Sequence, residues 1–197
     1  MAPVASTKHP GDSAGVPLPD GSWPDLPGTG GDLDVVRRFC NSINREQGGE
    51  AWRDVDELDR WLQAEGYEVG RLGPLHRDDL LALRDALWRS ISGRSLAPLA
   101  AALEHLRFRP IVDGGGLRLV VTGSAAEMTA GRLVGIIVDA QSTGAWDRVK
   151  ACQHCGWIFV DASRNNSGRW CSMSACGARE KARAYRRRRR VQDASGS

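Results

Sequence analysis

The sequence predicts an α+β fold, with a mainly helical body, a small antiparallel β-hairpin and a compact module of four cysteines at the C-terminal end. Three observations predict this fold. Apolar residues recur at spacings of three and four through most of residues 32–142, as on one face of a helix. Short apolar runs on either side of a glycine-rich turn at residues 113–116 interrupt that period. Cysteines then cluster beyond residue 150, at Cys152, Cys155, Cys171 and Cys176.

Residues 1–31, rich in Pro, Gly, Ser and Asp, are expected to form a disordered leader, because they cannot bury enough apolar surface to offset chain entropy. They lack the apolar segment of a signal peptide, and no stretch of the chain approaches the length of a transmembrane helix. We therefore expect a cytoplasmic protein without membrane contact. In that reducing compartment cysteines bind metal more often than they form disulfides.

Four helices are predicted in the first part of the body. The second begins at Asp54, which forms a capping box with Glu57. The third ends at Gly93, and Ser95 is expected to cap the fourth. The apolar positions that define the four helices are, in order, Leu33, Val36, Phe39, Cys40 and Ile43; Val55, Leu58, Trp61 and Leu62; Leu80, Leu83, Leu87 and Ile91; and Leu96, Leu99, Leu103 and Leu106.

A hairpin and a fifth helix complete the predicted body. Residues 108–112 and 117–121 have the composition of strands and flank the glycine-rich turn. Ser124 and Glu127 form a second capping box, which opens the fifth helix. Its apolar positions are Leu133, Ile136, Ile137 and Ala140. Residues 141–151 are expected to be a connector into the cysteine module.

The cysteine spacing Cys152-x2-Cys155-x15-Cys171-x4-Cys176 is typical of a zinc site. A Cys-x2-Cys turn places two thiolates on one side of a tetrahedral Zn²⁺ ion, and the second pair closes the site. Two disulfides, four unrelated thiols or a redox-active Cys152–Cys155 pair are the alternatives. We expect one structural Zn²⁺, since four cysteines fill the coordination shell and leave no open position for catalysis. The sequence contains no GxGxxG, P-loop or GxSxG motif, and we expect no enzymatic activity.

The cysteine module is expected to resemble a treble clef, in which a zinc knuckle is followed by a hairpin and a helix. In this interpretation residues 157–160 pair with Arg169–Trp170 across a polar turn at residues 161–168. Positions five apart on an α-helix are separated by about 140°. Cys171 should therefore precede the helix, with Cys176 in its first turns.

Other side chains of these segments are expected to have structural roles. Trp157 and Trp170 should form the small core of the module, with His154 facing solvent. Cys40 should belong to the core of the body. One helical stripe is expected to pack against the zinc module: Ala175, Ala178, Ala182 and Tyr185.

An arginine-rich segment follows the last cysteine. Between positions 179 and 190 eight basic residues oppose only Glu180, a net charge of +7; because the whole chain carries +3, the remainder carries −4. This asymmetry indicates a polyanionic partner, and we expect nucleic acid, duplex DNA in the first place. The expected contact residues are Arg169, Arg179, Lys181, Arg183, Arg186, Arg187, Arg188, Arg189 and Arg190.

From Cys152 to Lys181 the module resembles the CGNR zinc finger. The likeness rests on the two cysteine pairs and on three runs: Phe159-x-Asp161-x-Ser163-Arg164-Asn165, Arg169-Trp170-Cys171-Ser172-Met173 and Cys176-Gly177-x-Arg179-x-Lys181. Ala178 stands where the name motif of the family has asparagine, and Gly168-Arg169-Trp170 replaces the family's Arg-Arg-Trp.

The body resembles, more loosely, the ABATE domain of the same family of bacterial proteins, which are regarded as stress-induced transcriptional regulators. The likeness rests on the segments Leu33-x2-Val36…Asn41 and Leu58-x2-Trp61-Leu62. The resemblance implies DNA binding by the finger and ligand sensing by the body.

These expectations divide the chain into a leader (1–31), an ABATE-like α+β body with an effector site (32–142), a zinc finger with a basic helix (143–190) and a tail (191–197). Because residues 32–142 carry their own apolar stripes, the body is expected to fold without the finger. The predicted function is that of a DNA-binding transcriptional regulator. A zinc-stapled RNA-binding module or protein adaptor is the alternative.

Overall fold

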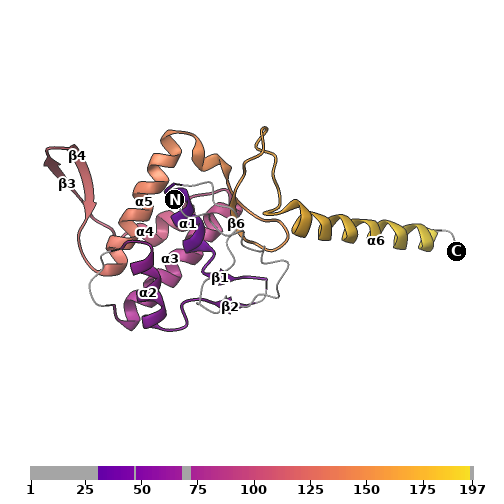
Figure 1. Cartoon of the computed structure of the whole chain (residues 1–197), viewed down its shortest axis with the longest axis horizontal. Helices are drawn as coiled ribbons and strands as arrows, with labels where there is room; N and C mark the ends of the chain where they lie inside the picture. The colour runs from indigo at the N-terminus through magenta and orange to yellow at the C-terminus, as the bar shows by residue number, and fades with distance from the viewer. Residues whose placement is uncertain (1–30, 47, 68–71, 196–197) are drawn as a thin grey trace, which may run out of the picture.

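The helical body lies in the middle of the molecule, with a β-hairpin projecting at one end and a long single helix at the other (Figure 1). The computed structural model describes residues 31–46, 48–67 and 72–195, so the predicted leader, Gly31 apart, lies outside the described residues. The elements in chain order are α1 Leu33–Cys40, β1 Ile43–Asn44, β2 Gly49–Glu50, α2 Val55–Ala64, α3 Pro74–Gly93, α4 Ala97–Leu103, β3 Phe108–Asp113, β4 Gly116–Val121, α5 Ala125–Ser142, the 3₁₀ helix η1 Ala145–Arg148, β5 Val149–Ala151, β6 Ile158–Val160, the π-helix η2 Met173–Gly177 and α6 Ala178–Ser195.

The predicted α+β class is confirmed. Helices dominate the described residues, and the strands form three separate two-stranded antiparallel sheets, β1–β2, β3–β4 and β5–β6. Among the helices of the described segments, none combines the length and the apolarity that crossing a membrane requires.

Both predicted capping boxes lie at helix starts. Asp54 accepts a hydrogen bond from the backbone N–H of Glu57 (2.8 Å) at the start of α2. At α5, Ser124 Oγ accepts from the N–H of Glu127 (3.2 Å), and the Glu127 carboxylate accepts from the N–H of Ser124 (2.7 Å). Each cap satisfies donors that a helix leaves unpaired and stabilises it by about 1 kcal/mol. The start of both helices was therefore predictable from local sequence.

The first helix is shorter than its apolar periodicity predicted. α1 ends at Cys40, and Ile43 lies in β1 opposite Glu50. Asn41, the residue directly after α1, forms hydrogen bonds with the backbone of the distant Ile158 through its side-chain amide. This contact fixes the point at which the chain leaves the helix.

The fourth helix also differs from the prediction. α4 is bounded by Leu96 and Glu104, so Leu96 and Leu106 lie outside it. Its N-cap position is Leu96 rather than Ser95, but Ser95 Oγ accepts a hydrogen bond from the N–H of Ala97 (3.3 Å), the first residue of the helix. Ser90 of α3 accepts a hydrogen bond from the N–H of Leu99 (3.0 Å). A donor in the first turn of α4 is thus satisfied by a neighbouring helix, which the local pattern does not reveal.

Strands β3 and β4 form the predicted hairpin, with Asp113 opposite Gly116 across a two-residue turn. Alternate residues of a strand share a face, so one side of this hairpin is entirely apolar. Much of that side faces solvent, since Val112 is 82% and Leu117 71% exposed. At the base of the hairpin, Val121 packs against the core of the body.

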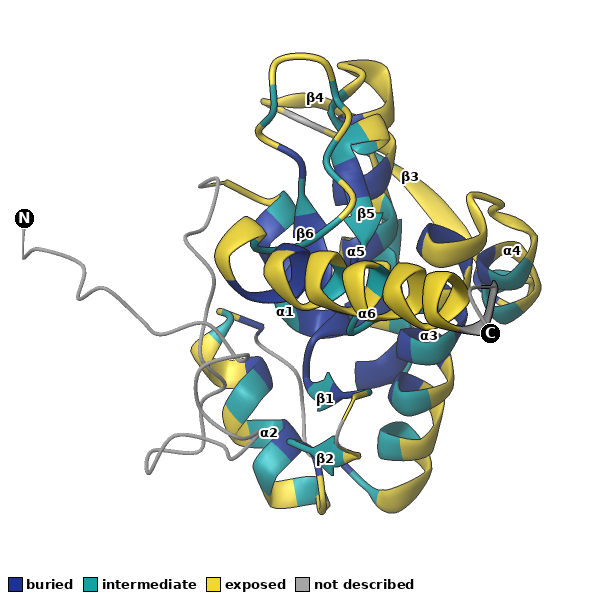
Figure 2. Cartoon of the chain, turned by 90° about the vertical axis from the view of Figure 1, so that its right-hand side faces the viewer, coloured by how far each residue is buried: buried dark blue, intermediate teal, exposed yellow. Residues whose placement is uncertain are grey.

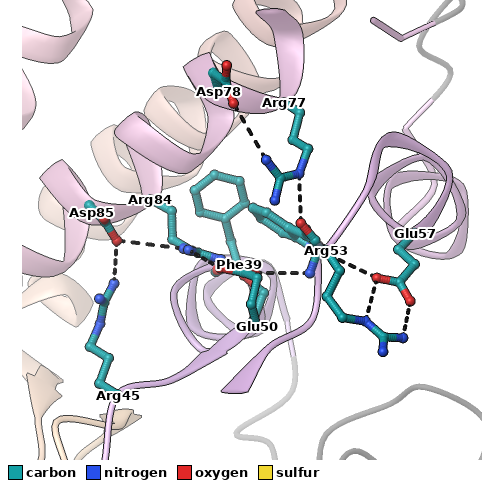
Figure 3. A network of polar contacts seen from close by, with 11 residues as sticks. Phe39, Arg45, Glu50, Arg53, Glu57, Arg77, Asp78, Arg84 and Asp85 are labelled. Atoms are coloured by element: carbon teal, nitrogen blue, oxygen red, sulfur yellow. Dashed lines mark hydrogen bonds and ion pairs between the residues drawn. The ribbon is translucent and has the colours of Figure 1, made fainter. Parts of the chain in front are cut away.

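Charged side chains attach the β1–β2 segment to α3 (Figure 3). Arg84, which is 2% exposed, forms two hydrogen bonds of 2.7 Å with Glu50 and lies over the ring of Trp52. Arg45 of β1's loop bonds Asp85 of α3 at 2.8 Å. A buried cation is tolerated only with such partners. This network fixes a segment whose two strands are too short to hold it alone.

The first strands of the finger share the apolar core of the body. Val149 of β5 and Ile158 of β6 are buried in the same cluster as Phe39, Leu87 and Leu133. A second, much smaller cluster lies around the cysteines and contains Trp157 and Phe159 among others.

The hairpin predicted within the finger is wrong. β6 pairs with β5, with Val149 opposite Val160 and Ala151 opposite Ile158. In the described chain Arg169–Trp170 has no strand structure, and residues 149–151, which were expected to be a connector, supply the partner strand. Burial explains the choice, because this pairing brings Val149 and Ile158 together in the core.

Candidate metal centre and basic helix

Neighbouring structure fixes the position of each of the four cysteines. Cys152 follows β5 and Cys155 precedes β6, so the turn between these strands is the zinc knuckle. The N–H of Gly156 donates to the carbonyl of Cys152 (2.9 Å), and Gly156 has φ +74°, which glycine adopts without strain. Cys171 precedes η2, and Cys176 lies within η2, which leads directly into α6. This is the predicted placement of the second pair.

The sulfur atoms have the spacing of a tetrahedral zinc site. All four lie within 4.8 Å of one another, and the three Sγ–Sγ distances among Cys155, Cys171 and Cys176 are 3.7 Å. Zn–S bonds of about 2.3 Å in a tetrahedron place sulfur atoms about 3.8 Å apart, whereas a disulfide requires about 2.05 Å. The disulfide alternative is therefore excluded, and the four cysteines hold one structural Zn²⁺.

Thiols this close do not ionise independently. Hydrogen bonds from Cys155 and Cys171 hold the pKa of Cys152 well below its usual range, whereas the contact with Cys152 raises the pKa of Cys171 far above it. Zn²⁺, when bound, neutralises the repulsion and allows all four to ligate as thiolates. Cys40 differs from these four, because burial raises its pKa to about 12. It lies in the core of the body, as predicted.

Side chains of the body dock the knuckle. The amide of Asn41 donates to the carbonyl of Ile158 and accepts from its N–H, both at 2.8 Å, as a neighbouring strand would. The indole N–H of Trp88 donates to the carbonyl of Gly156 (2.7 Å), and the guanidinium of Arg45 lies over the Trp88 ring. The metal site is thereby fixed to the body on two sides.

His154 lies between two carboxylates, so the prediction that it faces solvent is wrong. Its Nδ1 is 2.9 Å from Glu180 Oε1, and its Nε2 is 3.6 Å from Glu46 Oε1. The hydrogen bond with His154 lowers the pKa of Glu180. Arg179 Nη1 lies 3.6 Å from the same oxygen of Glu46. These contacts tie the first turn of α6 to the knuckle and to the body.

Beyond its first turn α6 leaves the rest of the molecule, and Figure 2 shows it exposed along nearly its whole length. It continues past Arg190 to Ser195, into the segment assigned to the tail. Near the start of the helix, Arg179 and Arg183 also lie within ion-pair distance of Glu46 and Glu180. All of the predicted cations on α6 are exposed: Arg179, Lys181, Arg183, Arg186, Arg187, Arg188, Arg189 and Arg190.

The apolar stripe predicted to face the zinc module does so only at Ala175, which is buried in η2. Ala178 and Ala182 are exposed, and Tyr185 is 57% exposed, so the remainder of that prediction is wrong. These residues stay exposed because the small core around the cysteines does not extend along α6.

Arg169, the remaining predicted contact, is exposed but engaged within the finger. Its Nε donates to Gln153 Oε1 (2.8 Å), and its guanidinium lies over the ring of Trp170. Trp157 is buried beside the cysteines, and Trp170 is partly buried against the same cluster. Both tryptophans therefore have the core role that was predicted.

Two residues that shape the finger, Lys150 and Asp161, were not assigned this role from the sequence. Their side chains form an ion pair of 2.6 Å, and Asp161 is only 3% exposed. One signal was available: an aspartate directly after a strand, followed by Ser, Asn and Gly, is typical of a loop that closes on its own side chain.

Comparison with known protein families agrees with this geometry. Residues 148–189 match the family model of the CGNR zinc finger, a range that includes the four cysteines and every expected contact cation except Arg190. No curated protein matches the chain. Ala178, in place of the asparagine of the name motif, is the exposed first residue of α6.

Proposed function

We propose that this chain is a DNA-binding transcriptional regulator, in which the CGNR zinc finger fixes the root of α6 and α6 presents its cations to the phosphates of duplex DNA. One observation carries the proposal: α6 projects away from the body with its arginines exposed (Figures 1 and 2). α6 contains two acidic residues, Glu180 and Asp193, and Glu180 is hydrogen-bonded to His154.

The affinity of such a helix comes mainly from counterion release. A helix turns only part of its surface to a groove, so we expect about four to six of the cations between positions 179 and 190 to meet phosphates. The logarithm of the binding constant should then fall against the logarithm of salt with a slope of about −4 to −5. Phosphate contacts position a protein without specifying sequence, so this term is the same for all duplexes.

The test compares duplex binding over a range of salt concentrations for the natural chain and for a variant with alanine at positions 186–190. The variant should bind all duplexes more weakly and with a flatter salt slope. A charge-matched control removes five exposed arginines of the body: Arg60, Arg89, Arg107, Arg109 and Arg118. Unchanged affinity and salt dependence in the α6 variant would show that α6 is not the contact surface.

The alternative partners have distinct signatures in the same assay. An RNA-binding module would prefer structured RNA over duplex DNA in competition at fixed salt. A protein adaptor would retain its partner after nuclease treatment. Either result would replace the DNA regulator proposed above.

In this proposal the body senses a ligand and has no enzymatic activity, and the protein acts in the cytoplasm. A hollow of about 220 Å³ supports ligand binding; it lies where α3 and α5 end beside η1, with Arg94, Gln141 and Trp146 among its lining residues. Ligand sites are typically about 300–1,000 Å³, so a ligand here would be small. Because η1 leads directly into β5 and the knuckle, that ligand would contact the junction of body and finger.

A further inference from the structure

The loop at residues 161–168 is held closed by its own aspartate. The Asp161 carboxylate accepts hydrogen bonds from the backbone N–H groups of Ser163 (2.9 Å) and Gly168 (2.6 Å) and from Lys150 Nζ (2.6 Å). Burial raises the pKa of Asp161, but these donors outweigh burial and hold it well below its usual range. The loop therefore closes around a charged group.

Two cations fix the backbone of the same loop. Lys150 Nζ also donates to the carbonyls of Asn166 (2.6 Å) and Gly168 (3.3 Å), and Arg148 donates to the carbonyl of Asp161 (2.9 Å). A Cβ atom at Gly168 would lie 2.6 Å from the Asp161 carboxylate, so only glycine allows this closure. These internal bonds restrain the backbone of the loop.

The internal bonds leave the tip of the loop free. Arg164 and Asn165 are exposed, and within the described residues neither side chain has a hydrogen bond or an ion pair. Arg169 differs, because Gln153 and Trp170 engage it. Figure 1 shows the loop between β6 and η2 rising beside the start of α6. The tip and the cations of α6 are thus joined through one metal centre.

We propose that Arg164 and Asn165 read base edges in the major groove of the DNA that α6 holds by its phosphates, an inference that rests on the proposed function. Arginine pairs with guanine and asparagine with adenine through two hydrogen bonds each, and these contacts discriminate between bases. Such readout requires side chains on a rigid support, which Asp161, Lys150 and Arg148 provide. The loop then supplies the sequence preference that α6 lacks.

The test selects duplexes from a random pool with the zinc-loaded full chain, and measures the ratio of affinities for selected and random duplexes. Arg164→Ala and Asn165→Ala should each lower that ratio about tenfold, at neighbouring G·C and A·T pairs. Arg186→Ala removes the same charge as Arg164→Ala but should weaken both duplexes alike and leave the ratio unchanged. Replacing the selected guanine with 7-deazaguanine, which lacks the major-groove N7 acceptor, should weaken the natural chain and not Arg164→Ala.

Positions 164 and 165 are exposed, so both variants should keep their zinc content and thermal midpoint. A chain that binds duplexes without enriching any motif would overturn the assignment of the loop and leave DNA binding intact. An unchanged ratio in both loop variants would do the same. Absence of binding to any duplex at low salt would instead overturn the proposed function.

Discussion

The base of the finger, formed by strands β5 and β6, and helix α6 belong to the same module of the chain, but different forces hold them. In the base, Ile158 is fully buried in the core of the body, and Asn41 completes its backbone hydrogen bonds. In α6, none of residues 181–193 is buried. Residues that determine stability and the cations proposed to contact DNA are therefore separate within one finger.

The amino-acid sequence of α6 also disfavours the formation of this helix. Five consecutive arginines place like charges three and four positions apart, which destabilises a helix by a few tenths of a kcal/mol per pair. Helices without packing are marginal in water because their first turn is costly to form. We infer that η2, fixed by the metal at Cys171 and Cys176, provides that first turn. In the proposed complex, DNA phosphates would relieve the repulsion.

Removing the metal should have the largest effect, because it removes the point at which α6 begins. Structural zinc contributes about 10–16 kcal/mol to the folding of small fingers. Cys176→Ser, or chelation, should therefore abolish zinc binding and the helical circular dichroism of the 18-residue α6. The body should keep a cooperative thermal transition, since most of its core lies outside the finger.

Elemental analysis and circular dichroism measure this result. Cys40→Ala is the matched control, because it removes a buried cysteine outside the metal site and should leave one zinc per chain. Persistent helicity of α6 in metal-free protein would show that the helix does not depend on its root.

Asn41→Ala should have the next largest effect, on the base of the finger. It leaves the N–H and carbonyl of Ile158 buried without these partners, which costs about 2–4 kcal/mol. For a domain of this size each kcal/mol lowers Tm by roughly 2–4 °C. Asn165→Ala, at an exposed asparagine, should leave Tm unchanged. Equal midpoints for the two variants would mean that apolar contacts alone hold the base.

Features set by neighbouring residues were predictable from the sequence. The caps at Asp54 and Ser124 connect residues three positions apart, and they lie where they were predicted. The zinc site was predictable because its chemistry restricts both residue type and spacing. The β3–β4 hairpin was predictable from its glycine-rich turn.

Features set by distant partners were not predictable. Asn41 and Ile158 are 117 positions apart, and no local pattern distinguishes β5 from Arg169–Trp170 as the partner of β6. The same contacts weaken the expectation that the body folds alone, since a chain ending at Gly144 would lose Val149 and Ile158 from its core. Periodicity also failed at Tyr185, where a helix has no surface to pack against.

Glu46→Gln should have a smaller effect, at the junction of the two regions. Glu46 lies near Arg179, so in the proposed complex with DNA it would compete with phosphate for that cation. Surface ion pairs contribute about 0–1 kcal/mol, so Tm should change little. Duplex affinity should rise, and the salt slope should steepen by up to about 0.9, the value of one added phosphate contact. Glu104→Gln makes the same charge change at an exposed position of the body and should alter neither property.

The smallest expected change in stability is that of Ala182→Gly, and Ala130→Gly provides its matched partner. Glycine in a helix interior costs about 1 kcal/mol relative to alanine. Ala130 is buried in α5, so that cost, together with the lost methyl packing, should lower the free energy of unfolding by about 1–2 kcal/mol.

Ala182 is exposed in α6, where the cost stays local, because this part of the helix is not packed against the body. Its thermal midpoint should therefore stay unchanged, while hydrogen exchange in α6 accelerates. Duplex affinity should fall by up to about fivefold, since a smaller fraction of the helix is formed before binding. Calorimetry, hydrogen exchange and a duplex titration measure the three quantities. A midpoint lowered as much by Ala182→Gly as by Ala130→Gly would show that α6 packs on the body in solution. The helix proposed to bind DNA would then not be structurally separate from the base of the finger.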